Sequence, residues 1–503
     1  MDVFPFFLGL PLSIMTFITI SDRVCVGSDK GFGVDRVIIL NIDYGPMITA
    51  LESRILDANS ESMGVSVETL MRNAGLALAE FVGKEAKGRI LFICGSGNNG
   101  GDGYAAYMSL KDRSDVCAFR EPKSPLCRKM AKDIRTIPYG DLNLDGYDVV
   151  VDCVLGTGPS GQLRQEYLDY IGCLNSSGKK IISCDVPTGF GTDTMVRPYA
   201  TVTFHDLKEG MGAECGIIEV RKIGIPPEAS SVVGKGDFLR YPVPKDDSHK
   251  GQNGRLLIIG GGPYVGAPIM AAMASLRTGV DLVTVMTPKG SFLPIASYSP
   301  AYMVRCLSSQ TLCMDDVDAI VEASEKADAV LIGPGLGTSP ETAEAVRAIA
   351  GRIDVPAVID ADGITCISGA IPKDKHIVFT PHAAELARLT GRKDPGDGEV
   401  SSFCGENGCV ILRKGRIDSV YDGKRVRENR TGSPGMTVGG TGDVLAGTVA
   451  GLMAKGMSGF DAACLGAHIC GLAGELAYGV HSYGMNATDV IDGIGRVLKE
   501  GLE

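Results

Sequence analysis

The chain has 503 residues, of which 44% are hydrophobic and 22% charged, and its formal net charge is -11. This length exceeds one ordinary domain and supplies apolar surface for large cores, so we expect two domains. Duplex binding depends on basic patches, and the acidic charge without a dense Lys/Arg run argues against nucleic acid as a partner.

The first 46 residues differ in composition from the rest. The segment from Phe4 to Ile20 is almost wholly apolar, yet it lacks the basic region of a signal peptide, contains Pro5 and Pro11, and is short for a spanning helix. We therefore expect residues 1–46 to be a leader outside the fold, with the working protein beginning near Met47 and no membrane partner. A membrane or export element is the alternative.

The first domain is expected over residues 47–240. Apolar residues recur at helical intervals from Ala50 to Val82, with a break at Gly64, which predicts two helices. Uniformly apolar runs, typical of strands covered on both faces, then predict a doubly wound α/β domain. The predicted strands span residues 90–94, 116–119, 149–155, 181–184 and 202–204.

Prolines and charged residues between Ile225 and Gly254 have a linker composition, so we place the domain boundary near residue 245. The α/β pattern then restarts and predicts a second doubly wound domain over residues 245–503. Its predicted strands span residues 256–259, 282–286, 330–332, 357–359, 377–379 and 410–412. Its predicted helices span residues 269–277, 383–389, 443–455 and 460–478.

The fifteen cysteines are scattered, mostly within apolar runs, without a Cys-x-x-Cys or a His/Cys cluster at zinc spacing. We interpret them as reduced core residues, which indicates a cytoplasmic protein. Cys404 and Cys409 are the closest pair in the sequence. A metal site at that pair is the alternative.

A glycine-rich segment, Cys94–Gly103, directly follows the first predicted strand. We expect the order strand, loop, helix, which is where an open parallel sheet binds ligands. Asn98, Asn99 and Asp102 supply amide and carboxylate oxygens for sugar hydroxyls or a hard cation. A plain flexible turn is the alternative.

Two aspartates follow later strands of the same predicted sheet, so they share an edge with Asn99. Asp152, Asn99 and the Thr188 region offer only oxygen ligands, which suit potassium or magnesium. The turn at residues 156–158 is a candidate phosphate cradle, and Asp185 is placed to bond a ribose or to transfer a proton. Each aspartate has the alternative role of capping a turn.

Polar segments of the second domain also lie just past apolar strands, at residues 333–337, 360–362, 380–385 and 414–415. His382 precedes a predicted helix and is placed to contact a ligand at its N-terminus, while Lys414 is placed to neutralise a nucleotide phosphate. A surface role for His382 is the alternative.

Residues 435–447 form the most informative segment of the chain. Gly439, Gly440 and Gly442 let backbone N–H groups face a ligand at the start of a predicted helix. Asp443 stands at that anion-binding end, where its natural task is to take a proton from a hydroxyl aimed at a phosphate. Capping of the helix by Thr441 or Asp443 is the alternative.

Together these motifs resemble the bifunctional NAD(P)H-hydrate repair enzymes, over about Met47 to Leu502. In that family a Rossmann-like NAD(P)HX epimerase domain precedes an ADP-dependent NAD(P)HX dehydratase domain of ribokinase-like fold. The resemblance rests on residues 70–75, 97–103, 152, 156–158 and 185–189 in the first half, and on 250–254, 333–337, 380–382 and 439–443 in the second.

The resemblance implies the following site residues. In the first domain the hydrated dinucleotide would contact Asn98, Asn99, Gly100, Gly101, Asp102, Gly156, Thr157, Gly158, Pro159, Ser160, Gly161, Gln162 and Asp185. In the second domain it would contact Ala267, Gly337, His382 and Asp443. The adenine nucleotide would contact Lys414, Gly415, Arg416, Ile417, Asp418 and Gly442, and potassium would bind Asn99, Asp152 and Thr188.

Asp443 and Asp185 are the catalytic residues that the resemblance implies, with potassium in the epimerase domain and magnesium with ADP in the dehydratase domain. The implied activity interconverts R- and S-NAD(P)HX and dehydrates the S form to NAD(P)H, giving AMP and phosphate. Two departures from the family pattern are Thr188, where Ser is usual, and Ala383-Ala384, where Pro-Gly is usual. The second departure changes the residues that directly follow His382 in that loop.

The amino-acid sequence alone leaves other functions open. Ribokinase-like vitamin kinases also carry a Gly-Thr-Gly-Asp loop, although they lack the attached Asn-Asn-Gly-Gly-Asp domain. The first domain is a binding scaffold in some relatives, which the presence of Asn99, Asp152 and Asp185 disfavours. The residues do not distinguish ADP from ATP, but the two-domain fusion is typical of ADP-using members. We expect small-molecule partners and a homo-oligomer.

Overall fold

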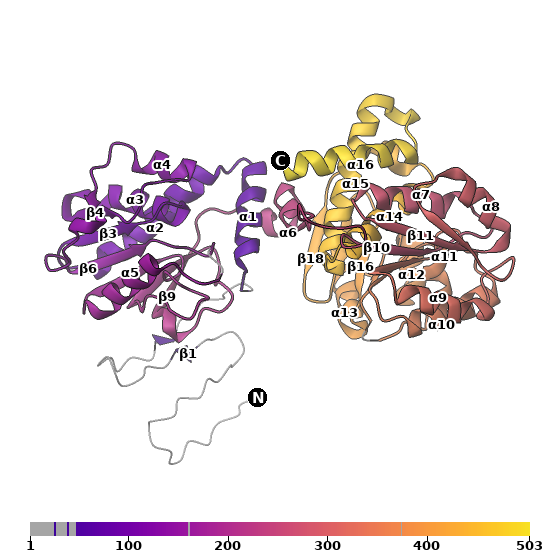
Figure 1. Ribbon diagram of the computed structural model, residues 1–503, viewed down its shortest axis with the longest axis horizontal. Helices are drawn as coiled ribbons and strands as arrows, with labels where there is room; N and C mark the ends of the chain where they lie inside the picture. The colour runs from indigo at the N-terminus through magenta and orange to yellow at the C-terminus, as the bar shows by residue number, and fades with distance from the viewer. Residues whose placement is uncertain (1–24, 27–37, 40–46, 159–160, 374) are drawn as a thin grey trace, which may run out of the picture. The chain divides into compact units, whose positions relative to one another are not determined.

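The computed structural model describes residues 25–26, 38–39, 47–158, 161–373 and 375–503 (Figure 1). The chain forms two compact units that divide between Ile225 and Pro226. The division falls before the boundary expected near residue 245, because residues 232–240 pack on the second unit. There Val232 bridges to Glu428, and Arg427 forms an ion pair with Asp237.

The first unit contains a seven-stranded, wholly parallel sheet in the order β5-β4-β3-β6-β7-β8-β9. The strands are β3 (Ile90–Cys94), β4 (Ser114–Ala118), β5 (Ile137–Pro138), β6 (Val149–Cys153), β7 (Lys180–Cys184), β8 (Ala200–Phe204) and β9 (Ile217–Arg221). The helices are α1 (Ala50–Ser62), α2 (Val67–Glu85), α3 (Asn98–Leu110), α4 (Pro125–Ala131) and α5 (Gln165–Ser176).

The sequence of strand β3 does not alternate between polar and apolar residues, because both faces of the strand are buried. Ile90 and Phe92 face the core under α2 and α3, whereas Leu91 and Ile93 face the core under α5. Helices therefore cover both faces of the sheet, and every residue of the strand is buried. This doubly wound arrangement confirms the fold class expected for the first domain (Figure 1).

The second unit has a nine-stranded sheet in the order β12-β11-β10-β13-β14-β15-β16-β17-β18, with β17 and β18 antiparallel to their neighbours. Its strands are β10 (Arg255–Ile259), β11 (Leu282–Thr287), β12 (Met303–Cys306), β13 (Ala329–Ile332), β14 (Ala357–Ile359), β15 (Ile377–Phe379), β16 (Val410–Arg413), β17 (Asp418–Tyr421) and β18 (Val426–Asn429).

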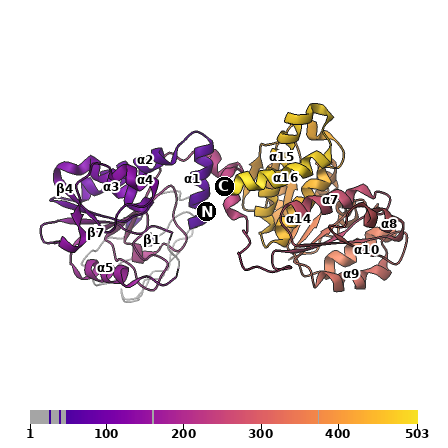
Figure 2. The same ribbon diagram turned by 45° about the horizontal axis from the view of Figure 1, so that its top comes forward.

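Two groups of helices cover this sheet, which confirms the second doubly wound domain (Figure 2). One face carries α7 (Gly266–Arg277), α14 (Thr441–Ala454), α15 (Gly459–His481) and α16 (Ala487–Leu502). The other carries α9 (Val317–Ser324), α10 (Pro340–Arg352), α11 (Asp362–Ile367), α12 (Ala383–Thr390) and α13 (Asp397–Asn407). The remaining helices are α6 (Glu228–Ser231) and α8 (Lys289–Tyr298).

Within the described ranges, α15 is the one helix long and apolar enough to cross a membrane, and 67% of its apolar stretch is buried. Its side chains belong to the core of the second unit. The expected leader lies outside the described residues, apart from the short strands β1 (Cys25–Val26) and β2 (Ile38–Ile39), which pair antiparallel.

One local expectation was wrong, because residues 98–103 are not a loop. Asn98 is the first residue of α3, and the glycines lie in the first two turns of that helix. A Cβ on Gly100 would lie 2.1 Å from the carbonyl oxygen of Gly95. The glycines therefore allow the helix to pack directly on the end of β3 rather than giving a flexible turn.

Candidate active sites

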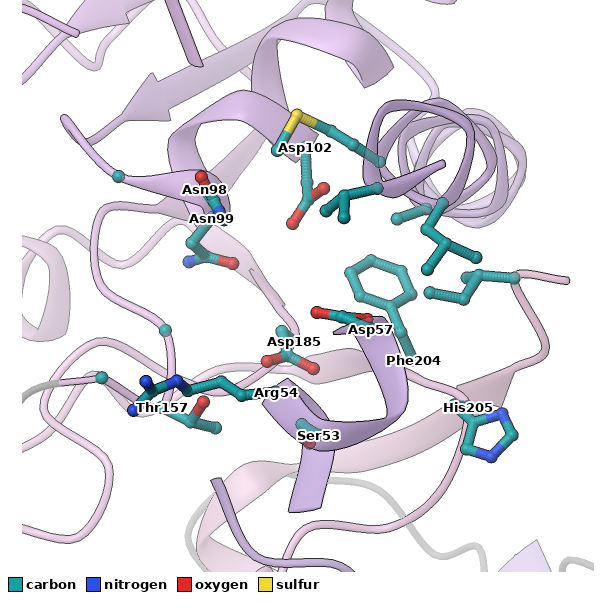
Figure 3. A pocket seen from close by; sticks show the side chains of 18 of the residues that line it. Ser53, Arg54, Asp57, Asn98, Asn99, Asp102, Thr157, Asp185, Phe204 and His205 are labelled. Carbon is teal, nitrogen blue, oxygen red and sulfur yellow. The ribbon is translucent and has the colours of Figure 1, made fainter. Parts of the chain in front are cut away.

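A cavity of about 420 Å³ lies in the first unit at the carboxyl ends of β3, β6 and β7 (Figure 3). Seven of the predicted residues line it, namely Asn98, Asn99, Asp102, Gly156, Thr157, Gly158 and Asp185. Gly100 and Gly101 are buried within α3, Gly161 and Gln162 are not among the lining residues, and Pro159 and Ser160 lie outside the described residues. The parallel sheet thus brings together side chains that are distant in sequence.

Asp185 is held at this cavity by a buried lysine. Its φ of 61° is unusual for a residue other than glycine and turns the chain sharply after β7. The Lys208 Nζ lies 3.1 Å from Asp185 Oδ1 and also donates to the Phe204 carbonyl oxygen at 2.7 Å. Thr203 Oγ1 donates to the same carboxylate oxygen at 3.3 Å. The carboxylate therefore has a fixed position and a compensating charge.

Two further carboxyl groups line the same cavity. Burial raises the pKa of Asp57 to about 6, and repulsion from Asp185 adds to this while Lys208 opposes it. Burial also raises the pKa of Asp102 well above its ordinary value, with smaller contributions from Asp185 and Asp57. Three carboxyl groups and one buried lysine therefore share the cavity, an arrangement suited to proton transfer.

Asp152 is fully buried at the end of β6 and accepts several hydrogen bonds. Thr188 Oγ1 donates to Asp152 Oδ1 at 2.7 Å, and the Thr188 N–H donates to Oδ2 at 2.9 Å. Tyr170 and Ser183 donate to the same carboxylate at 2.8 Å and 3.0 Å. The expected juxtaposition of Asp152 and Thr188 is therefore present in the structure.

The oxygen atoms of Asn99, Asp152 and Thr188 fit a potassium ion, because the Asn99 amide is buried without a hydrogen-bond partner among the described residues. Neither its Oδ1 nor its Nδ2 has a hydrogen-bond partner in the described part of the chain. A Cβ on Gly156 would lie 3.4 Å from the Asn99 Cβ, and the Leu155 N–H donates to Thr188 Oγ1 at 3.0 Å. Asn99, this turn and the Asp152–Thr188 pair are thus in one place, and an orphaned buried oxygen there suits a hard cation.

In the second unit, Lys414 joins the carboxylates that end several strands. Its Nζ lies 2.9 Å from Asp360 Oδ1 and 4.0 Å from Glu385 Oε2, and Thr380 Oγ1 donates to Asp360 Oδ1 at 2.7 Å. Burial alone would lower the pKa of Lys414, but attraction to Asp360 and Glu385 outweighs it and raises that pKa. The lysine therefore remains a cation in this site.

Asp443 lies in the first turn of α14, near this cluster. Burial raises the pKa of Asp443 to about 7, and repulsion from Asp360, Asp362 and Glu385 adds to the shift while Lys414 opposes it. A carboxyl group with that pKa accepts a proton at neutral pH. The cluster thus gives Asp443 the acid–base character expected from the sequence.

The capping alternative for this segment is not what the structure shows. Helix α14 begins at Thr441, and its N-cap is Gly440, with φ of 98° and no capping side chain. The Thr441 hydroxyl donates instead to the Met436 carbonyl oxygen at 2.9 Å. A Cβ on Gly442 would lie 3.4 Å from Lys414 Nζ, so the glycine brings the open helix end close to the lysine.

His382 is the N-cap of α12. Its Nδ1 accepts from the Ala384 N–H at 3.1 Å, and its own N–H donates to Glu385 Oε2 at 2.9 Å. The side chain is 55% exposed, and its Nε2 lies 3.5 Å from Glu385 Oε1. The exposed side chain of His382 agrees with the surface role and also leaves room for the predicted contact with a ligand.

The remaining predicted residues lie around the same rim. The Gly337 N–H donates to Asp362 Oδ2 at 2.8 Å, and Ala267 is in the first turn of α7. The Gly415 N–H donates to Asp418 Oδ1 at 3.0 Å, while Arg416 and Ile417 are exposed. Burial raises the pKa of Asp418. This turn between β16 and β17 presents exposed groups directly after Lys414.

Comparisons with known proteins agree with this two-site organisation. A family model described as NAD(P)H-hydrate dehydratase matches residues 256–496, and one described as YjeF-related protein N-terminus matches residues 67–210. A bifunctional NAD(P)H-hydrate repair enzyme of Methanothermobacter thermautotrophicus is 38% identical over 94% of this chain and 98% of the relative. One of Pyrobaculum aerophilum is 39% identical over 90% of this chain and 98% of the relative.

The chain belongs to the bifunctional NAD(P)H-hydrate repair enzymes. Among solved structures, an ADP/ATP-dependent NAD(P)H-hydrate dehydratase of Bacillus subtilis, co-crystallised with ATP and Mg²⁺, is 22% identical with a TM-score of 0.48. The match covers 54% of this chain and 99% of that one.

Within this repair enzyme, several lining residues escaped prediction. The cavity of the first unit also contains Ser53, Arg54 and Asp57 from α1, and His205 and Lys208 from the segment after β8. None of these follows a glycine motif, and α1 carries an ordinary amphipathic pattern. In the second unit, the sequence predicts polar segments just past the strands but does not predict the grouping of Asp360 and Glu385 around Lys414.

Proposed function

We propose that this repair enzyme uses its two units for two reactions on hydrated nicotinamide cofactors. The first unit interconverts R- and S-NAD(P)HX in the cavity that contains Asp185. The second dehydrates S-NAD(P)HX to NAD(P)H at the expense of ADP, giving AMP and phosphate. The observation that carries the proposal is Asp443, whose pKa is raised to about 7 at an open helix end near Lys414.

The chemistry of the second reaction explains why such a carboxylate is needed. The C6 hydroxyl of the hydrate is a poor leaving group. Asp443 takes the hydroxyl proton, the oxygen attacks the terminal phosphorus of ADP, and AMP departs. The phosphate then leaves C6 while a proton leaves C5, which restores the ring double bond of NAD(P)H. Backbone N–H groups at the start of α14 stabilise the transferring phosphoryl group.

Lys414 and its neighbours bind the nucleotide in this proposal. The Lys414 ammonium neutralises phosphate charge, with Gly442 allowing close approach and residues 415–418 contacting the adenosine part. Gly337, His382 and Ala267 contact the hydrate. Magnesium would accompany ADP, and the carboxylates of Asp360 and Asp362 near Asp443 would provide the oxygen ligands that this ion prefers.

The first unit binds the hydrated dinucleotide along residues 98–102 and 156–162, with Asp185 at the reacting end. Asn99, Asp152 and Thr188 would hold potassium, which would supply positive charge at this site. The Thr188 hydroxyl keeps the oxygen that Ser would supply. We also propose a cytoplasmic homo-oligomer that needs neither nucleic acid nor a membrane.

The test uses the purified full-length chain and a mixture of R- and S-NADHX. With ADP and Mg²⁺, we expect recovery of absorbance at 340 nm from the S form first and then from the R form. Asp152→Ala removes an acceptor of hydrogen bonds from three side chains and from the Thr188 N–H, and it should abolish use of the R form beyond its spontaneous rate. ATP replaces ADP in a parallel assay, and no recovery with either nucleotide would reject the proposal.

A further inference from the structure

Helix α1 supplies one wall of the cavity in the first unit. Ser53 and Asp57, one helical turn apart, both line it. The helix is fixed there because Ile48, just before its Thr49 cap, bridges in parallel to Lys208, with Ile48 N–H donating to the Leu207 carbonyl oxygen at 2.8 Å. The segment that holds Lys208 against Asp185 thus also holds α1.

The polar groups on this wall lack protein partners. In the described part of the chain, Ser53 Oγ is buried without a hydrogen-bond partner, and the Asp57 carboxyl has neither a hydrogen bond nor an ion pair. Figure 3 shows Asp57 and Asp185 facing the same space. Unpaired polar groups that line a cavity are costly to bury, so their presence there indicates contacts with a ligand.

Asp57 and Asp185 differ in their surroundings. Lys208 Nζ compensates the charge of Asp185 at 3.1 Å, whereas burial raises the pKa of Asp57 to about 6. Two nearby carboxyl groups in unlike environments divide into a proton donor and a proton acceptor. Burial therefore favours the protonated form of Asp57.

We propose that Asp57 is a catalytic acid–base residue of the epimerase, acting together with Asp185 in the same cavity. This inference rests on the function proposed for the first unit. It gives α1 a chemical role in addition to its packing against α2. The ligand class is a ring whose reacting carbon carries both a hydroxyl group and the ring nitrogen.

The reaction balances without any further reactant. The Asp185 carboxylate takes the proton of the C6 hydroxyl, the C6–O bond becomes a carbonyl, and the C6–N1 bond breaks. Asp57 gives its proton to N1, which receives the electron pair of the broken bond. Rotation about the C5–C6 bond presents the other face of the aldehyde. N1 then attacks C6 again, its proton returns to Asp57, and Asp185 returns its proton to the oxygen.

The decisive variant is Asp57→Asn, measured as interconversion of R- and S-NADHX without ADP. We expect a loss of about 10²- to 10⁴-fold, the usual contribution of a general acid–base group. Asp57→Glu should recover part of the rate, and dehydration of pure S-NADHX should be unchanged in both variants. Glu61→Gln, which removes an exposed charge from the same helix, is the matched control and should retain full epimerisation.

The pH dependence of epimerisation distinguishes a catalytic role of Asp57 from a packing role. The titratable and charged groups that line the cavity with Asp57 are Asp102 from α3, Asp185 after β7, His205 and Lys208 after β8, and Arg54 on α1. In the unaltered chain, kcat/KM for epimerisation should fall as pH rises above about 6, since Asp57 must carry a proton. This limb should disappear in Asp57→Asn. A retained limb, or an Asp57→Asn rate within threefold of the unaltered chain, would overturn the role of Asp57.

The same assay distinguishes an error in the function proposed for the first unit from an error in the role of Asp57. If the unaltered chain does not interconvert the two epimers, the function proposed for the first unit is wrong. If it does and Asp57→Asn matches it, only the assignment of Asp57 is wrong.

Discussion

The ammonium group of Lys414 lies 2.9 Å from Asp360 Oδ1, and this pair connects the ends of two strands that are neighbours of β15. Asp360 follows β14 and Lys414 follows β16. The pair is largely buried, with 18% of the lysine and 2% of the aspartate side chain exposed. Lys414 also lowers the pKa of Asp443. Lys414 therefore compensates a buried carboxylate and also influences the protonation of Asp443.

Lys414→Gln should weaken nucleotide use and stability together. Loss of a charge-assisted contact of about 1.5–3 kcal/mol corresponds to a roughly 10- to 100-fold lower kcat/KM for ADP. Because the substitution removes the ion-pair partner of the buried Asp360 side chain, we expect a stability loss of about 3 kcal/mol. Steady-state kinetics and urea unfolding measure the two effects. Exposed Lys424→Gln is the control, and equal behaviour of the two variants would contradict this role.

The pH dependence of dehydration should report Asp443. The base must be ionised, and its pKa is raised to about 7, so kcat/KM should rise about tenfold per pH unit below 7 and level off above it. Lys414→Gln should move the midpoint upward, since the lysine favours the ionised form. A flat profile from pH 5 to 8 in the unaltered chain would exclude Asp443 as the base.

The position of α14 depends on its glycine contact with α7. A Cβ on Gly447 would lie 2.2 Å from the Ala271 carbonyl oxygen. We therefore expect Gly447→Ala to cost about 1–3 kcal/mol of unfolding free energy and to slow dehydration, because the helix that carries Asp443 must shift. Gly495→Ala on the exposed side of α16, where a Cβ meets nothing within 4 Å, should instead stabilise by about 0.5–1 kcal/mol. Urea unfolding compares the two, and similar values would contradict the packing argument.

Asn99→Ala tests the potassium site. The substitution removes the orphaned Oδ1, so epimerisation should become slow and insensitive to K⁺, while the unaltered chain should be faster in KCl than in choline chloride at equal ionic strength. Asn143→Ala, which removes an amide from a turn outside the cavity, should keep the potassium response. Unchanged potassium dependence in Asn99→Ala would show that the ion binds elsewhere.

The sequence located the parts of both sites that follow parallel strands. Asp152, Asp185 and Lys414 each come at the end of an apolar run, and strands of a parallel sheet bring such residues to one edge. Asp57 and Lys208 could not be placed in this way. Their positions at the cavity depend on where α1 docks, which is decided by the pairing of Ile48 with Lys208 rather than by a local motif.

Strands β17 and β18 escaped prediction for a related reason. Their residues, Asp418–Tyr421 and Val426–Asn429, mix polar and apolar side chains instead of forming apolar runs. They extend the sheet as antiparallel neighbours of β16, and Asn429 in β18 donates to Asp418 and to the Ala467 carbonyl oxygen. Their polar side chains form tertiary contacts that the local pattern does not reveal.

Asp443→Asn decides whether one carboxylate drives dehydration. The substitution keeps the size of the side chain but removes the base, so turnover of S-NADHX with ADP should fall about 10²- to 10⁴-fold at pH 8. ADP binding by calorimetry and epimerisation by the first unit should both persist. An Asp443→Asn enzyme that restores the 340 nm absorbance as fast as the unaltered chain would contradict the account.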